Sequence, residues 1–332
     1  MTEHRIKSGF LFLVFVVSFG YALIYHIRPS VDARLFHETA IELATHGRYC
    51  VACDTVPLDR DPAMDNVGPG YQFFLGGVYK LFGIHPWIVW LLQSLMHVLV
   101  VAWLWMLIKK ILPVESPRWH VLLPLGLYVF HPDVIQQNAM LMSEALFLFL
   151  LMASVRIFVG VLDKKVSDRS THWLEVISLG LVLGGLFMVR PPGLLILFLT
   201  TAFLVWKRFW KQAVLILVIF FALQVPWSIR NVQVYHHFIL QAPINGRNLW
   251  VGLHPESGGE FNVPDEVTKK LEGLDAFSRE QVSMEETKKI IFTHPGYAIT
   301  RTIHKGFKLF ALSKTSGFWF HYYSRFDHVL TL

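Results

Sequence analysis

Long stretches without a single Asp, Glu, Lys or Arg constrain this chain more than any other feature. Residues 9–27 and 86–108 are two such stretches, and each is long enough to cross the roughly 30 Å hydrocarbon layer of a bilayer as a helix. Of the 332 residues, 54% are hydrophobic and 16% are charged, whereas roughly a quarter are charged in an average soluble domain. The sequence therefore predicts an all-α, polytopic membrane protein.

Seven apolar segments are expected to span the membrane. They cover residues 9–27, 86–108, 120–134, 140–162, 174–189, 191–206 and 212–227. The third segment is short and contains Pro124, and the fifth and sixth meet at Arg190-Pro191-Pro192, where proline ends or kinks a helix.

The Lys and Arg residues indicate the orientation of these segments. They gather in the short connections at residues 1–8, 109–119, 163–173 and 207–211, which the positive-inside rule places in the cytoplasm. The net charge of +6 thus lies at the ends of apolar segments, so it does not indicate nucleic-acid binding. The first segment has no clear A-x-A cleavage site. We expect an uncleaved, multi-pass protein of a bacterial inner membrane with its N-terminus inside.

This topology divides the chain into two parts. A transmembrane domain covers residues 1–227 and includes an extracytoplasmic first loop at residues 28–85. An extracytoplasmic segment covers residues 228–332. It contains one amphipathic helix, at about residues 296–312, with four apolar side chains on one face: Ile299, Ile303, Phe307 and Phe310.

The first loop carries two patterns that can bind metals. Cys50 and Cys53 form a single C-x-x-C pair, which makes half a zinc site at best; in an exported loop it is either a small disulfide or two thiols. Asp59, Asp61 and Asp65 could hold a divalent cation through oxygen ligands, but we favour a solvated acidic loop. The sequence thus predicts no metal site and no cofactor, with a divalent cation left open.

Asp32 is the first candidate for a chemical role. A helix is expected to begin near it, with Phe36, Ala40 and Leu43 on the same face as Asp32, and we expect that face on the membrane surface. A carboxylate there is costly unless it has a partner or a function. The alternative is that Asp32 only caps the helix, because Asp is a favoured N-cap residue.

Four further residues complete the candidate site. Glu144 lies near the outer end of the fourth segment, where it is either a functional intramembrane carboxylate or an acid favoured by the helix dipole. Arg190 ends the fifth segment, where it either pairs with a phosphate or extends to the interface. Arg230 and Arg247 supply guanidinium groups suited to phosphate, although an isolated arginine is usually a solvated surface charge.

Ordered motifs along the chain resemble those of one known family. They are Asp32 with the helix ending at residues 46–49, residues 68–75 with 81–83, residues 143–147, residues 189–191, residues 226–231 with 248–252, and residues 294–295 with 305–310. In this order they resemble the C-fold glycosyltransferases that use polyprenyl-phosphate sugars, the superfamily of protein O-mannosyltransferases and lipid A aminoarabinose transferases. The chain departs from the family pattern at Ala33 and Phe36, where members often have Glu and Tyr, and it lacks the further spans that usually follow the last motif.

The resemblance implies an inverting glycosyltransferase. Such an enzyme moves a sugar from a polyprenyl-phosphate-sugar donor to a lipid, glycan or protein acceptor on the extracytoplasmic face. Asp32 and Glu144 would then be the catalytic residues, with Asp32 as the base, and Arg190, Arg230 and Arg247 would bind the donor phosphate. The alternative is a non-catalytic or truncated relative that binds or transports a lipid phosphate.

Overall fold

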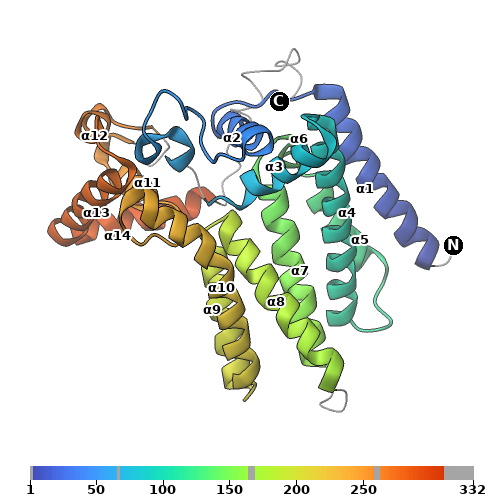
Figure 1. Ribbon diagram of the computed structural model, residues 1–332. Helices are drawn as coiled ribbons and strands as arrows, with labels where there is room; N and C mark the ends of the chain where they lie inside the picture. The colour runs from blue at the N-terminus through green and yellow to red at the C-terminus, as the bar shows by residue number, and fades with distance from the viewer. Residues whose placement is uncertain (1–2, 66–67, 164–168, 258–261, 310–332) are drawn as a thin grey trace. The chain divides into compact units, whose positions relative to one another are not determined.

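A computed structural model describes residues 3–65, 68–163, 169–257 and 262–309 (Figure 1). Within these residues the chain is helical and contains no strand, which confirms the all-α prediction. Its contacts divide the described chain into two compact units: residues 3–49 with 68–226, and residues 50–65 with 227–309. The expected first loop is therefore divided, because residues 50–65 group with the C-terminal segment.

The first unit consists of long apolar helices and the short helices that connect them. They are α1 (Glu3–Tyr25), α2 (Asp32–His46), α3 (Gly70–Phe82), α4 (Pro86–Ile111), α5 (Trp119–Val129), α6 (Pro132–Ala139), α7 (Ser143–Asp163), α8 (Arg169–Val189), α9 (Gly193–Trp206) and the first part of α10 (Trp210–Tyr235).

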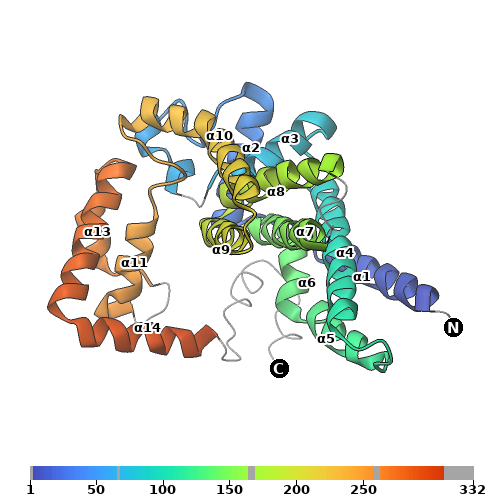
Figure 2. The same ribbon diagram turned by 90° about the horizontal axis from the view of Figure 1, so that it is seen from below.

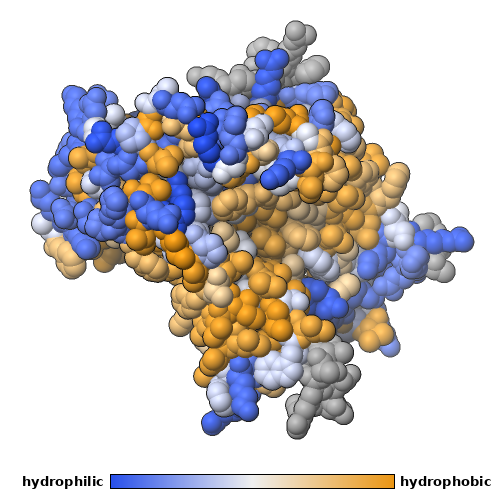
Figure 3. All heavy atoms as spheres, in the orientation of Figure 1, coloured by the Kyte–Doolittle hydropathy of each residue, from blue (hydrophilic) through white to orange (hydrophobic). Residues whose placement is uncertain are grey.

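Four of the described helices, α1, α4, α7 and α10, are long and apolar enough to cross a membrane. Three shorter apolar helices, α5, α9 and residues 173–189 of α8, coincide with the other expected spans. Hydrophobic surface extends along the lower helices in Figure 3, with hydrophilic residues at the lower end of α10. These features describe a membrane-embedded protein.

The expected third span, residues 120–134, is wrong as a single helix. Helix α5 ends at Val129 and α6 begins at Pro132, with His131 in an extended conformation between them. Proline disfavours the helical conformation in the residue before it, which is why the helix ends there.

Close packing in the first unit depends on small residues. Helices α4, α7 and α8 run side by side in Figure 1. On α8, a Cβ atom added at Gly184 would lie 2.7 Å from Cδ2 of Leu223 on α10, and one at Gly180 would lie 3.0 Å from Cβ of Ile219. This pair of glycines, four residues apart, is typical of helices that approach closely inside a membrane.

The second unit is built from shorter helices. They are η1 (Leu58–Arg60), η2 (Pro62–Asp65), the last part of α10, α11 (Asn245–Leu253), η3 (Pro255–Ser257), α12 (Asp265–Leu271), α13 (Ala276–Thr293) and α14 (Pro295–Leu309). In Figure 2, α11 lies beside α13, and α14 follows across their ends. The expected amphipathic helix is α14, although Phe310 lies outside the described residues.

Candidate functional site

Two predicted site residues from distant parts of the sequence, Glu144 and Arg190, form an ion pair. Nη1 of Arg190 lies 3.0 Å from Oε1 of Glu144, and the side chains are 30% and 21% exposed. The second oxygen of Glu144, Oε2, is buried and has no hydrogen-bond partner among the described residues, and the same is true of Oγ of Ser143. Glu144 is therefore more than a dipole-compensating acid at a helix start, since it also holds the guanidinium group of Arg190.

The turn between α8 and α9 places Arg190. Helix α8 ends at Val189, and Pro191 and Pro192 follow Arg190 before α9 begins at Gly193. The amide of Gly193 donates to the carbonyl oxygen of Arg190 at 3.1 Å. A Cβ atom at position 193 would lie 2.6 Å from the backbone nitrogen of Phe187, so only glycine allows this tight reversal.

The Gly68-Pro69-Gly70 turn brings α3 against the same end of α8. A Cβ atom at Gly70 would lie 2.8 Å from the carbonyl carbon of Met188 and 2.8 Å from the nitrogen of Val189. The backbone of α3 thus contacts the backbone of α8 one residue before Arg190. This contact places Tyr71, the next residue of α3, beside the Glu144–Arg190 pair.

Tyr71 is the centre of a buried hydrogen-bond network. Its hydroxyl donates to Oε1 of Gln93 at 2.7 Å, and Nε2 of Gln93 donates to the carbonyl oxygens of Asn138 and Met140 at 2.8 and 2.9 Å. Burial raises the pKa of Tyr71 well above its ordinary value, and the nearby Tyr79 and Glu144 raise it further. The network therefore holds the connection between α6 and α7 immediately before Glu144.

Sequence reasoning missed Tyr71 and Gln93 as members of this site. A signal for Gln93 was present, because it is a polar residue inside the charge-free run of residues 86–108. Polar residues inside a membrane span usually face the protein interior and find a partner there. Tyr71 lies in the motif at residues 68–75, but there it indicated only an interfacial anchor, since interfacial tyrosines are common.

Asp32 is exposed at the first position of α2. Our expectation that its helix face lies on the membrane surface is wrong, because Phe36 and Ala40 are buried and that face packs against α3. The rings of Phe36 and Tyr71 meet edge to face, with centroids 5.4 Å apart. The cap position is Val31, so Asp32 is not itself the N-cap; it stands in the first turn of a helix one turn before the contact with Tyr71.

Arg230 belongs to the second unit, where its motif has a structural role. Its guanidinium carbon lies 5.1 Å from the ring centroid of Trp227. Nε1 of Trp227 donates to the carbonyl oxygen of Gln241 at 2.7 Å, and Nδ2 of Asn231 donates to that of Ile239 at 2.9 Å. Two residues of the motif thus fix the loop that follows α10.

Arg247 lies in the first turn of α11, where a carboxylate already occupies the helix start. Oε2 of Glu280 accepts a hydrogen bond from the amide of Gly246 at 2.8 Å. Burial raises the pKa of Glu280, and its hydrogen bonds from the amides of Gly246 and Arg247 oppose this rise. A donor phosphate bound at these amides would have to displace Glu280. The structure therefore joins Glu144 with Arg190, while Arg230 and Arg247 belong to the other unit.

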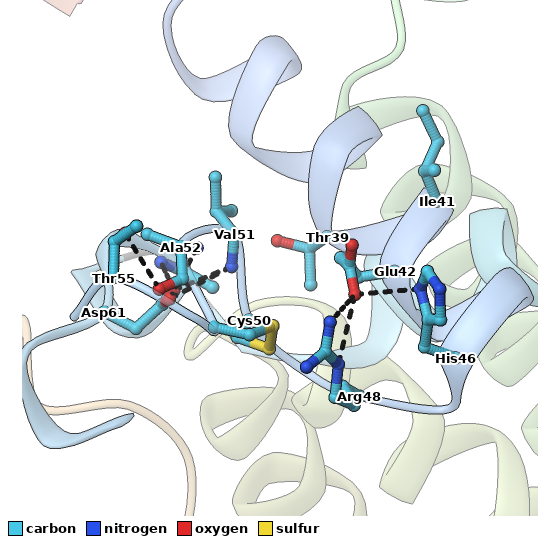
Figure 4. The surroundings of a disulfide bond; sticks show 12 residues. Thr39, Ile41, Glu42, His46, Arg48, Cys50, Val51, Ala52, Thr55 and Asp61 are labelled. Carbon is cyan, nitrogen blue, oxygen red and sulfur yellow. Dashed lines mark hydrogen bonds and ion pairs between the residues drawn. A yellow bond between two sulfur atoms is a disulfide. The ribbon is translucent and has the colours of Figure 1, made fainter. Parts of the chain in front are cut away.

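The two metal-binding patterns of the first loop have structural uses (Figure 4). Cys50 and Cys53 form a disulfide, so neither offers a thiolate. Asp61 is fully buried, not solvated as expected. Its carboxylate accepts hydrogen bonds from the amides of Val51, Ala52 and Ala63 at 2.8–3.1 Å. The side chain of Asp65 lies outside the described residues.

No protein-family model matches this chain, and no curated protein matches it. The family resemblance therefore stays a prediction based on the motifs.

Proposed function

We propose that the chain is a glycosyltransferase that moves a sugar from a polyprenyl-phosphate donor to an acceptor on the extracytoplasmic face, with inversion. The observation that carries the proposal is the half-buried Glu144–Arg190 pair. The pair lies where the motifs at residues 68–75, 143–147 and 189–191 meet, beside the buried hydroxyl of Tyr71. In the proposed topology, the chain has seven spans and its N-terminus inside, so that this pair lies at the extracytoplasmic surface of a bacterial inner membrane.

The proposed reaction assigns a role to each group. The leaving group is a phosphate monoester with a long apolar tail, so positive charge at the bilayer surface assists its departure. Arg190 presents a planar fork of five N–H donors, and its contact with Glu144 orients this fork. As the acceptor oxygen bonds to the anomeric carbon, the bond from that carbon to the phosphate oxygen breaks, and the acceptor proton passes to a base.

Asp32 is the proposed base. It is exposed, so it is accessible to an acceptor, and it begins the helix whose Phe36 contacts Tyr71. A base in an inverting transfer acts on the face of the sugar opposite the leaving group. Asp32 and Arg190 would thus act from opposite sides of the sugar ring.

A second candidate function, lipid-phosphate binding or transport without chemistry, is favoured by a different observation. His97 is buried in the middle of α4, where Nδ1 lies 2.7 Å from Oγ of Ser18 on α1. Its Nε2 atom is buried and has no hydrogen-bond partner within the part of the chain that the structure describes. Ionisable residues inside a span often mark a transport pathway, and transporters place their sites near the midplane.

The test is transfer by the purified protein in liposomes, with a panel of labelled polyprenyl-phosphate sugars and with lipid, glycan and protein acceptors. Asp32→Asn should reduce transfer at least about 100-fold at unchanged melting temperature. The matched control is Asp265→Asn, because Asp265 is also exposed at the first position of a helix. It should leave transfer unchanged.

Three outcomes would count against the proposal. Transfer by Asp32→Asn within a few-fold of the wild type would remove Asp32 as the base. Donor binding without transfer across the whole panel would favour the lipid-phosphate carrier. Loss of that binding in His97→Ala, with retention in Asp32→Asn, would place the carrier site in the membrane.

A further inference from the structure

One face of helix α14 packs on the rest of the second unit. The hydroxyl of Tyr297 donates to the carbonyl oxygen of Leu253 at 3.0 Å, and Nη2 of Arg301 donates to that of Pro255 at 3.2 Å. Ala298 is buried between them. The orientation of α14 about its own axis is therefore set by its contacts with the end of α11 and with η3.

The opposite face of α14 is apolar and exposed. Ile299, Ile303 and Phe307 are 60%, 55% and 74% exposed, and their spacing of four residues places them on one side of the helix. Phe292, near the end of α13, is also exposed. Singly exposed apolar residues are ordinary, but a stripe on a helix that is already docked by its other face indicates a binding surface.

The charge of this segment indicates what binds there. Residues 287–309 contain five basic residues and no acidic residue; the basic residues are Arg301, which also bonds to Pro255, and Lys288, Lys289, Lys305 and Lys308. A helix with an apolar face and an excess of basic residues is typical of segments that lie in the plane of a membrane interface, where anionic headgroups attract the positive charge. An apolar partner protein would not require this complete absence of acidic residues.

A membrane is also available to this surface, because the chain is membrane-embedded. Helix α10 is one of the four candidate spans, and its last residues already belong to the second unit. We propose that α14 and the end of α13 lie on an anionic membrane surface. Ile299, Ile303 and Phe307 enter the boundary between headgroups and acyl chains, and the second unit thereby acquires a fixed height above the bilayer.

The experiment uses the full chain in nanodiscs that contain phosphatidylglycerol. The two native cysteines form a disulfide, so a nitroxide label reacts with a single introduced cysteine. The labelled variants are Ile303→Cys, Ile299→Cys, and the controls Thr302→Cys and His304→Cys. Both control positions are exposed, and each is rotated by about 100° from Ile303 because a helix has 3.6 residues per turn. Collision rates with oxygen and with a water-soluble nickel chelate measure the depth of each label.

Labels at Ile303 and Ile299 should collide with oxygen at least about threefold more than with the chelate, while both control labels favour the chelate, since an in-plane helix buries only its apolar face. In phosphatidylcholine alone, the difference should decrease. Equal access of the chelate to all four labels would overturn the proposal, because the face would then be in water. Exclusion of both reagents from Ile303 would overturn it too, because that face would be covered by protein. If the labels lie at the same depth in phosphatidylcholine alone, the proposal that anionic headgroups hold the helix is wrong.

Discussion

The hydroxyl of Tyr71 donates a 2.7 Å hydrogen bond to Oε1 of Gln93. Nε2 of Gln93 in turn donates to the carbonyl oxygens of Asn138, near the end of α6, and of Met140, just after it. Both side chains are fully buried. Two residues that lie 22 positions apart thus connect α3, α4 and the end of α6 around the Glu144–Arg190 pair. The position of Glu144 depends on this network as well as on its own helix.

Replacement of Gln93 by Leu should destabilise the protein. It leaves the Tyr71 hydroxyl and two buried carbonyl oxygens without partners, at about 1–3 kcal/mol for each unsatisfied group. Ser94→Ala is the control, since Oγ of Ser94 bonds to the carbonyl oxygen of Trp90 in its own helix. Thermal unfolding in detergent measures both. If Tyr71→Phe and Gln93→Leu have strictly additive effects, the two residues do not act as one network.

Gly70→Ala should push α3 away from α8, because its methyl group would lie 2.8 Å from the backbone of Met188 and Val189. Such overpacking costs about 1–3 kcal/mol, and transfer should fall as well, since Tyr71 moves with the helix. Gly77→Ala on the same helix is the control, because beyond the neighbouring backbone of α3 no atom of the described residues lies within 4 Å of the added carbon. It should be neutral or stabilising by up to about 1 kcal/mol. Equal melting temperatures for the two variants would contradict the close contact.

Arg190→Gln should reduce transfer by about 100- to 1,000-fold, as expected for removal of one group that stabilises a developing negative charge. Glu144→Gln should have a smaller effect, because the guanidinium group stays but its orientation is less fixed. Kinetics in liposomes measure both variants. Lys270→Gln removes a more exposed ion pair, with Glu286 at 2.7 Å, and should leave transfer unchanged. A larger loss from Glu144→Gln than from Arg190→Gln would reverse the proposed roles.

Asp61→Ala should destabilise the second unit more than loss of the disulfide. The carboxylate accepts from three backbone amides, of which that of Ala63 is buried and those of Val51 and Ala52 are partly buried. A buried amide left without a partner costs about 1–3 kcal/mol. The disulfide closes a loop with a sequence separation of 3, for which chain entropy predicts only about 2 kcal/mol. Melting of Asp61→Ala and of the double variant Cys50→Ala/Cys53→Ala compares them. We expect the double variant to keep transfer activity, and a double variant that folds but is inactive would contradict this.

Glu280 should make the second unit less stable as the pH rises. Burial raises its folded-state pKa above the ordinary value of 4.5, so the folded protein binds more protons than the unfolded chain. This contribution to stability is complete below pH 4.5 and is lost as the pH rises through the raised pKa. The control is Glu280→Gln, which keeps an oxygen for the amide of Gly246. As the pH rises from 4.5 through the raised pKa, the melting temperature of the wild type should fall relative to that of this variant.

Glu286 provides a control of opposite sign. The hydrogen bond from Lys270 lowers its pKa, so its contribution to stability is present above its ordinary pKa of 4.5 and is lost as the pH falls through the lowered value. The difference in melting temperature between the wild type and Glu286→Gln should therefore disappear at acid pH. A Glu280→Gln profile parallel to the wild type at every pH would show that burial does not shift the Glu280 carboxyl group.

The sequence by itself determined the elements that depend on local composition. Charge-free runs fixed the positions of α1 and α4, because a bilayer requires long apolar helices wherever the chain crosses it. Pro191 and Pro192 predicted that the helix ends or kinks after Arg190, and the spacing of Ile299, Ile303 and Phe307 predicted α14. Glu144 and Arg190 were candidates for the same local reason, since charged residues are rare at the ends of apolar segments.

Only the tertiary structure decided which of these residues meet. Arg190 pairs with Glu144 because the α7–α8 hairpin brings the two helix ends together, whereas Arg230 and Arg247 are equally basic but belong to the other unit. The face of α2 that carries Phe36 packs on α3 because Gly76 allows close approach: a Cβ atom there would lie 3.0 Å from Cβ of Leu43. An apolar face has the same sequence pattern whether lipid or protein covers it, so hydrophobic periodicity could not distinguish the buried face of α2 from the exposed face of α14.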